Sequence, residues 1–286
     1  MATMREIKRR RSSIQSTQQI TKAMKLVSTV KLQRARSRAE SAKAYFSHMY
    51  QTVSSILAKA GNVDHPYVQG NASDNVGIVV VTSNRGLAGG YNANIVRMIL
   101  ASAFDKEKVR IYGVGRKGIE GLERKGYQIA GNFSEVIEEP TYEQAQELSA
   151  RLLEDFEKGK IGEIYVAYTE FRNTVSHVPK LMKLLPIEKK EDVFDEAADR
   201  LTLMNFEPSE EEVIALLIPK YITSILYGSF VEAVASENGA RMQAMDAATN
   251  NAEEIIDDLE LKYNRARQGA ITQELTEIIA GAEAIG

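Results

Sequence analysis

All six prolines of this chain lie between Pro66 and Pro219, so neither the first 65 residues nor the last 67 contain one. Proline removes an amide donor, and its ring clashes with the preceding helical turn. Proline-free segments of this length therefore predict long, uninterrupted helices at both ends of the chain. Because a globular helix averages about 11 to 12 residues, two such helices cannot both fit within one compact core, and we expect them to support each other.

A repeating apolar pattern predicts how the terminal helices pair. Counted in sevens from Ile7, the a and d positions of the first helix from residue 32 onward are all apolar: Leu32, Ala35, Ala39, Ala42, Phe46, Met49, Val53 and Ile56. The same count from Val231 gives a second seam: Ala235, Asn238, Met242, Met245, Thr249, Ala252, Ile256, Leu259, Tyr263, Ala266 and Ala270. One seam at each end favours a single coiled coil. Two separate amphipathic helices, or a homodimeric zipper, remain alternatives because alanine-rich seams also suit ordinary helix packing.

Charge indicates an antiparallel pairing. Residues 1–40 hold eleven Lys or Arg and two acidic residues, whereas residues 246–261 hold six acidic residues and no base. Antiparallel helices bring residues 5–11 level with residues 257–260, where exposed pairs, contributing only about 0 to 1 kcal/mol each, fix register more than stability. The second helix should then project as a single helix from near Arg267, and its apolar residues would need a partner. A frayed terminus is the alternative.

The middle of the chain predicts a Rossmann-like domain. Apolar runs at 76–82, 109–114 and 163–169 alternate with helical stretches, which is typical of a parallel sheet covered on both faces, and residues 174–187 indicate a further strand with prolines at its edges. We therefore expect an α/β protein with long terminal helices. Its predicted parts are a coiled-coil helix at 1–60, the Rossmann-like domain at 75–190, an acidic connection at 191–208 with an edge strand over 200–206, and a second coiled-coil helix at 209–286.

Two glycine motifs raise an enzyme hypothesis. GVGRKG at 113–118 fits the GxGxxG pattern of dinucleotide-binding loops, and Glu135 could sit where a ribose-binding carboxylate belongs. The motif follows the second strand instead of the first, so a plain strand-to-helix turn is the better interpretation. RGLAGGYN at 85–92 lacks the Gly-Lys-Ser/Thr of a phosphate loop. His48, His65 and His177 show no ligand spacing. We expect no cofactor, no metal and no catalytic group.

Composition narrows the class of protein further. The chain has 286 residues, 44% of them hydrophobic, a net charge of −3 and no cysteine, so it can form one or two ordinary domains without disulfides. No apolar run approaches the roughly 18 residues of a membrane span. The basic N-terminus is similar in composition to a transit peptide, but its heptad seam continues into residues 32–56, so we expect it to belong to the mature fold.

Three sequence motifs together resemble the gamma subunits of F-type ATP synthases. They are ITKAMKLVS at 20–28, TSNRGLAGGYN at 82–92 and YNRARQGAITQELTEIIAGAEA at 263–284. The resemblance covers the whole chain in order, and the last motif is the most specific. It implies terminal helices paired in an antiparallel coiled coil, with a Rossmann-like domain at the base.

The resemblance also implies a function and partners. In this family, proton flow turns a membrane ring of c subunits, the asymmetric gamma shaft turns inside a hexamer of alpha and beta subunits, and the catalytic sites on beta change affinity in sequence. The family's roles fall on these residues: beta contact and coupling on Met24, Lys25, Arg267, Gln268, Thr272, Glu274 and Glu277; contact with epsilon and the c ring on Leu203, Met204, Phe206 and Glu207; an apolar bearing on Ile271, Leu275, Ile278 and Ile279.

Departures from the family are small. Asn84 and Ala88 stand where many relatives have Asp and Cys, and the regulatory cysteine insertion of chloroplast members is absent. The chain therefore looks bacterial, and we expect a peripheral position on the cytoplasmic side of the cell membrane, without direct membrane insertion and without a nucleic-acid partner. A dinucleotide-binding enzyme with helical arms and a general coiled-coil scaffold are the alternatives; the first would bind dinucleotide as an isolated protein.

Overall fold

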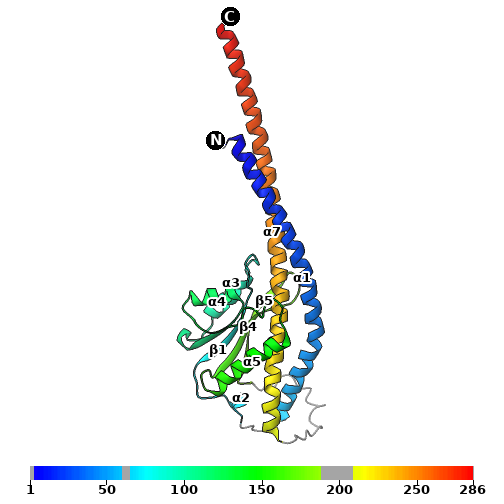
Figure 1. Ribbon diagram of the computed structural model, residues 1–286, viewed down its shortest axis with the longest axis vertical. Helices are drawn as coiled ribbons and strands as arrows, with labels where there is room; N and C mark the ends of the chain where they lie inside the picture. Colours follow the sequence, from blue (N-terminus) through cyan, green and yellow to red (C-terminus); the bar gives the residue numbers. More distant parts are fainter. Residues whose placement is uncertain (1–2, 60–64, 188–208, 286) are drawn as a thin grey trace. The chain divides into compact units, whose positions relative to one another are not determined.

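The computed structural model describes residues 3–59, 65–187 and 209–285. Figure 1 shows two long helices and a mixed α/β region. The elements in chain order are α1 (Met4–Lys59), α2 (Pro66–Gln69), β1 (Val76–Val81), α3 (Tyr91–Leu100), the short 3-10 helix η1 (Lys106–Lys108), β2 (Val109–Val114), α4 (Arg116–Glu123), β3 (Gln128–Asn132), α5 (Tyr142–Glu157), β4 (Glu163–Phe171), β5 (His177–Leu185) and α7 (Glu210–Ile285).

The described residues form two compact units, and both long helices contribute to each. The helical unit consists of Met1–Ser28 and Arg241–Gly286, and the α/β unit of Thr29–Ala240. The four-part division predicted from the sequence stays a prediction. The predicted connection at 191–208, including the edge strand over 200–206, lies outside the described residues.

The α/β unit is built on a five-stranded sheet in the order β3-β2-β1-β4-β5. The first four strands are parallel, and β5 pairs antiparallel with β4 at the sheet edge. Each of the three predicted apolar runs forms a strand, although β4 continues to Phe171. The further predicted strand is β5, and its edge position tolerates Pro179, which cannot donate to a ladder. The central strand β1 is buried along its whole length, as a parallel strand covered on both faces should be.

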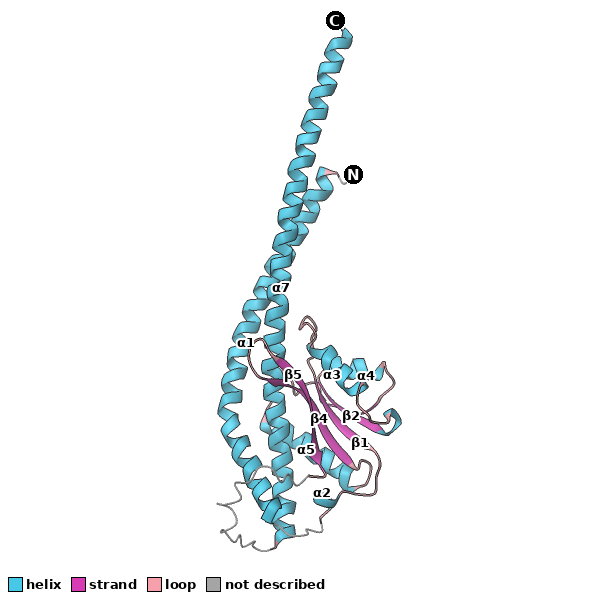
Figure 2. Cartoon of the chain, turned by 180° about the vertical axis from the view of Figure 1, so that it is seen from behind, coloured by secondary structure: helices cyan, strands magenta, loops and turns pink. Residues whose placement is uncertain are grey.

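Helices cover both faces of this sheet (Figure 2). On one face, Ile78 and Val80 of β1 belong to a core with Ile95 of α3 and Leu122 of α4. The opposite face carries the larger core, which combines residues of β1, β2, β4 and β5 with α5, α7 and Val53 of α1. Alternate side chains of a strand point to opposite faces, so β1 serves both cores at once.

The N-terminal part of α7 is a core helix of the α/β unit. Its buried residues Ile222, Leu226 and Phe230 lie in the larger core. By length and composition alone, α7 also holds one 18-residue window apolar enough to cross a membrane, and half of that window is buried within the protein. Pro219 lies inside α7 and cannot donate to the carbonyl four residues earlier, while its own carbonyl accepts from the Thr223 hydroxyl at 2.8 Å.

In the helical unit, α1 and α7 pair antiparallel along the predicted seams. From Met242 to Ala270, every predicted seam position of α7 is buried or partly buried, and most of the intervening residues are exposed. Ile7 and Leu259 are among the most buried residues of the unit, at 8% and 5% exposure. The predicted meeting of charges is confirmed at one pair, because the guanidinium of Arg11 lies 3.3 Å from a carboxylate oxygen of Glu260.

A polar layer interrupts the apolar seam of the helical unit. The hydroxyls of Thr249 and Thr21 are 2.8 Å apart across the helix pair, and Thr249 also donates to the carbonyl of Met245 at 2.7 Å. One turn along, the ammonium of Lys25 lies 2.5 Å from a carboxylate oxygen of Asp246. Polar groups in an apolar seam specify register at some cost in stability, because a shifted register would bury them without partners.

Replacing Thr21 and Thr249 together by Val should therefore loosen the register without unfolding the pair. Removing both partners of a hydrogen bond is nearly neutral, so we expect the free energy of unfolding to change by less than about 1 kcal/mol. Register can be read by disulfide formation, since the chain has no cysteine. Arg11→Cys with Glu260→Cys reports the native register, and Arg11→Cys with Glu253→Cys reports a shift of one heptad. Shifted crosslinks should rise only in the double Val variant; equal yields in both backgrounds would contradict the role of this layer.

The most buried carboxylate among the described residues, that of Asp155, fixes the end of α5 in the α/β unit. It accepts hydrogen bonds from Tyr112 at 2.8 Å, Lys160 at 2.7 Å and Arg151 at 3.1 Å. Burial opposes the charge, but these hydrogen bonds and the neighbouring positive charges outweigh it, so the pKa of the Asp155 carboxyl lies below its ordinary value. A lowered folded-state pKa means that this stabilisation is present above about pH 3.9, the ordinary pKa, and is lost as the pH falls below it.

Asp155→Asn should therefore lower the thermal midpoint at pH 7 by an amount that shrinks toward pH 3. Asparagine keeps the shape but accepts only neutral hydrogen bonds, and the loss should be roughly 1.5 to 3 kcal/mol. Glu147→Gln is the matched control, because Glu147 is exposed on the same helix. Equal midpoints for the wild type and Asp155→Asn at pH 7 would contradict the proposed role of the carboxylate.

Candidate functional site on the terminal helices

The end of α7 extends beyond the residues that pair with α1. Near the end of the pair, the guanidinium of Arg11 lies 3.3 Å from Glu260 and 6.0 Å from the ring centroid of Tyr263, and Ile7, one turn closer to the start of α1, is still buried. From Ile271 to Ala282 every residue of α7 is exposed. α7 continues as a helix to Ile285. The projecting single helix stays a prediction, with a frayed terminus as its alternative.

The coiled-coil seam becomes polar at this point. Continued past Ala270, its spacing reaches Gln273 and Glu277, and the amide of Gln273 donates to the carboxylate of Glu277 at 3.0 Å. If a further stretch of α1 packed against this part of α7, these two positions would be expected to be apolar. At these two positions the exposed end of α7 therefore lacks the apolar seam of the helix pair.

The apolar residues of the exposed end lie on a different face. Ile271, Leu275, Ile278 and Ile279 are 50% to 68% exposed. Their spacing of four, three and one residues places them within an arc of roughly 100°, rotated away from the seam. An apolar stripe of this kind in water indicates a surface covered by another molecule.

Arg267 and Gln268 lie at the base of this stripe. Both side chains are exposed and make no hydrogen bond or ion pair to any described residue, while the backbone carbonyl of Gln268 accepts from the Thr272 hydroxyl at 2.9 Å. The guanidinium and the amide can therefore offer donors outward. Glu274 is exposed and lies seven residues from Arg267, on the same side of the helix.

On α1, the residues predicted for coupling are less exposed than their neighbours. Met24 is partly buried, and Lys25 is engaged with Asp246 of α7. The most exposed large apolar residues of α1 among the described residues are Ile20, Leu26 and Val27, at 58% to 63% exposure. These three residues were not predicted as contact residues. Their positions away from the heptad seam do indicate that they lie on the exposed face of α1.

The residues predicted to contact epsilon and the c ring, Leu203, Met204, Phe206 and Glu207, lie outside the described residues. Their role stays a prediction from the family resemblance.

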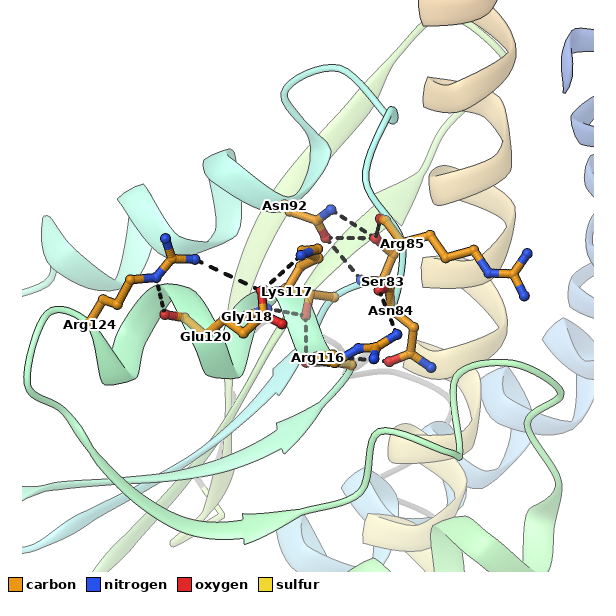
Figure 3. Close-up of polar contacts among 11 residues, drawn as sticks. Ser83, Asn84, Arg85, Asn92, Arg116, Lys117, Gly118, Glu120 and Arg124 are labelled. Carbon is orange, nitrogen blue, oxygen red and sulfur yellow. Dashed lines mark hydrogen bonds and ion pairs between the residues drawn. The ribbon is translucent and has the colours of Figure 1, made fainter. Parts of the chain in front are cut away.

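The glycine motifs meet at the carboxyl ends of β1 and β2 in the α/β unit (Figure 3). The first three amides of α4 are already hydrogen-bonded: Arg116 to the side chain of Asn84 at 2.9 Å, Lys117 to the carbonyl of Ser83 at 3.0 Å and Gly118 to the hydroxyl of Thr82 at 2.8 Å. A dinucleotide loop presents such amides to a pyrophosphate. Here the loop after β1 accepts these hydrogen bonds, so the motif joins that loop to the start of α4.

Gly115 shows why the motif needs glycine. Its φ is +106°, and a Cβ at this position would lie 2.0 Å from the carbonyl oxygen of Thr82. The second motif is closed in a similar way, since the side chain of Asn92 accepts from the Ser83 amide at 2.9 Å. Glu135 is exposed beyond β3. Close approach to the backbone of Thr82 therefore explains Gly115, and a side-chain hydrogen bond closes the second motif.

The three histidines lie in different surroundings. His48 is exposed on α1, His65 accepts from the amide of Tyr67 at 3.2 Å, and His177 begins β5. Across residues 3–59, 65–187 and 209–285, no three His, Cys, Asp or Glu side chains gather as they would around a metal ion.

Comparisons with known proteins agree with this arrangement. The family model described as ATP synthase matches residues 3–285. The ATP synthase gamma chain of Lachnoclostridium phytofermentans is 60% identical over the full length of both chains. The gamma chain of Acetobacterium woodii, described as sodium ion specific, is 39% identical over 99% of this chain and 98% of that protein.

Solved structures show the same fold. The model matches a chain in the structure of the Euglena gracilis mitochondrial ATP synthase, described as OSCP/F1/c-ring, with a TM-score of 0.70 and 17% identity, over 99% of this chain and 94% of that one. A chain of the Tetrahymena thermophila mitochondrial ATP synthase, described as central stalk/c-ring, matches with a TM-score of 0.59 and 23% identity, over 80% of this chain and 99% of that one. From the family model and the full-length relatives, this chain belongs to the ATP synthase gamma chain family.

Proposed function

We propose that this chain is the rotor of the central stalk, transmitting rotation of a membrane c ring to the catalytic beta subunits and so coupling proton flow to ATP synthesis. The observation that carries the proposal is the exposed end of α7, whose apolar stripe lies on a face that α1 does not use. The stripe is the surface that an alpha–beta hexamer covers. Full-length identity of 60% to a gamma chain supports these partners.

The apolar stripe suits a bearing. Apolar contacts are non-directional, so a helix end bearing Ile271, Leu275, Ile278 and Ile279 can turn inside an apolar sleeve without breaking hydrogen bonds at every step. Arg267 and Gln268 differ in kind, because their donors are directional and engage a beta loop in some rotational positions and not in others. Thr272, Glu274 and Glu277 border the same region.

Coupling requires that the shaft distinguish the states of beta. A rotor shifts a subunit between open and closed conformations only if its faces contact those conformations unequally. The helical unit meets this condition: α1 presents Ile20, Leu26 and Val27, and the end of α7 presents a polar base and an apolar stripe. Met24 and Lys25 lie beside the exposed apolar residues of α1. A shaft with one uniform face could not order three catalytic sites.

The chain itself is non-catalytic in this proposal, and the catalytic sites lie on beta. The hydrogen-bonded amides of α4 support this, because the loop most similar to a nucleotide-binding motif has its donors occupied. The protein would lie on the cytoplasmic side of the cell membrane as a peripheral subunit, with epsilon and the c ring at its foot. The pure chain should hydrolyse no ATP, whereas turnover by the pure chain would contradict the proposal.

Replacing Arg267 and Gln268 together by Ala should lower ATP synthesis more than assembly. Hydrogen bonds to a charged group contribute roughly 1.5 to 3 kcal/mol each, so we expect the synthesis rate per assembled complex to fall at least about tenfold. The matched control replaces Asn264 and Arg265, which are exposed one turn earlier on α7. Unchanged synthesis in membranes with normal amounts of complex would rule out this role.

A reversible crosslink tests rotation inside the hexamer. Met24→Cys joined by a disulfide to a cysteine in the facing part of beta should stop synthesis and hydrolysis, and reduction should restore both. Leu203→Cys joined to the c ring is the control and should leave turnover intact, since those parts would turn together. High-yield crosslinking of Met24→Cys with continued multiple turnovers would exclude torque transmission through this shaft.

A further inference from the structure

The hairpin of β4 and β5 packs against α7 through a notch at Gly239. His177, the first residue of β5, pairs with Phe171, the last of β4, and their ring centroids are 6.1 Å apart. A Cβ on Gly239 would lie 2.7 Å from Cε1 and 3.1 Å from Nε2 of His177. The imidazole therefore occupies space that is open only because residue 239 of α7 is a glycine. This space is the Gly239 notch. All of these residues belong to the α/β unit.

Neighbouring contacts tie the same part of α7 to the sheet side of the unit. The hydroxyl of Ser236, three residues before Gly239, donates to the carbonyl of Thr169 on β4 at 3.0 Å and is buried. The phenol of Tyr91 at the start of α3 donates to the carbonyl of Ala233 at 3.1 Å. His177 thus sits at one end of a short series of contacts that positions the sheet on this stretch of α7.

The imidazole of His177 is buried with little polar support, which comes from the backbone of Thr174. Neither Nδ1 nor Nε2 has a hydrogen-bond partner among the described residues, and both atoms are buried. A neutral imidazole tolerates such a place, but an imidazolium carries two donors and a charge, and burying these unpaired is costly. Burial accordingly lowers the pKa of His177, an effect that the backbone of Thr174 partly opposes.

The charged groups of the surrounding elements are engaged elsewhere. On β4, Glu170 lies 3.0 Å from Arg172 and 3.1 Å from Lys180 of β5. Burial and the neighbouring carboxylate of Glu232 on α7 both raise the pKa of Tyr168. Glu237 lies on the side of α7 away from Gly239, at 100° per residue. Among the residues that the structure describes, no carboxylate contributes to the pKa of His177.

We propose that His177 is a pH-responsive latch, which seats the β4–β5 hairpin on α7 while the imidazole is neutral and leaves the Gly239 notch when it is protonated. The latch is a property of the chain itself. Its consequence rests on the proposed rotor function: acidification would loosen the sheet from the rotor helix and reduce the torque passed between them.

The direction of the effect follows from linkage. The folded-state pKa lies below the ordinary value of 6.5, so the latch is fully stable above about pH 6.5 and weakens as the pH falls from there to the folded-state pKa. In this window the opening equilibrium constant should rise about tenfold for each pH unit. Below the folded-state pKa the dependence ends.

Amide hydrogen exchange of the full-length chain between pH 8 and pH 5, corrected for intrinsic rates, tests the latch. Protection of β4 and β5 should fall with pH in the wild type, and His177→Phe should remove that dependence. His48→Gln is the control and should keep it, since His48 is exposed. Gly239→Ala keeps the histidine but fills the notch, so it should restore an ordinary imidazole pKa, measured by NMR. An ordinary pKa for His177 in the wild type, or an unchanged profile in His177→Phe, would overturn the proposal.

A second measurement separates the latch from the rotor function. ATP-driven proton pumping per ATP hydrolysed, in membranes carrying the full complex, should fall between pH 7.5 and pH 6 in the wild type and less in His177→Phe. If hydrogen exchange shows the expected pH dependence but pumping does not differ between the wild type and His177→Phe, the functional consequence is overturned. The proposal that His177 responds to pH would still hold. Failure to assemble with alpha and beta would instead overturn the rotor function alone.

Discussion

The antiparallel register of α1 against α7 in the helical unit decides which residues are available to partners. Arg11 against Glu260, Thr21 against Thr249 and Lys25 against Asp246 fix that register by polar contacts. Each exposed pair contributes little stability. Together they fix the position of α1 along α7. This matters because α7 must extend beyond α1 by a set number of residues if its apolar stripe is to stay uncovered. A slip of one heptad would cover part of the end that we propose turns inside the hexamer.

One helix serves two different physical purposes. In the α/β unit, α7 is a core helix whose Ile222, Leu226 and Phe230 are almost completely buried against the sheet. In the helical unit it is half of a two-helix seam and then an exposed single helix. Because the chain is continuous through both, α7 is a covalent link between the sheet and the exposed end. A rotor needs such a link, since torque applied at one place must appear at another.

Much of the fold could be predicted from the sequence, for identifiable reasons. Heptad spacing and charge identified the seam and the Arg11–Glu260 pair, and continuous apolar runs identified β1, β2 and β4. Strand β3 was missed because QIAGN alternates exposed and partly buried residues at the sheet edge and contains no apolar run. The engagement of Lys25 with Asp246, and the occupied amides of α4, depend on tertiary geometry that no local pattern encodes. The coupling roles of individual residues stay predictions.

Single-molecule rotation tests the central claim most directly. The alpha–beta hexamer would be fixed to a surface, and a bead would be attached through Arg124→Cys, directly after α4. The side chain of Arg124 is 77% exposed, and the new cysteine would be the only one in the chain. With ATP present, we expect continuous rotation in one direction, with one pause for each catalytic site. A bead that stays still, or turns at random, while the same complexes hydrolyse ATP would contradict it.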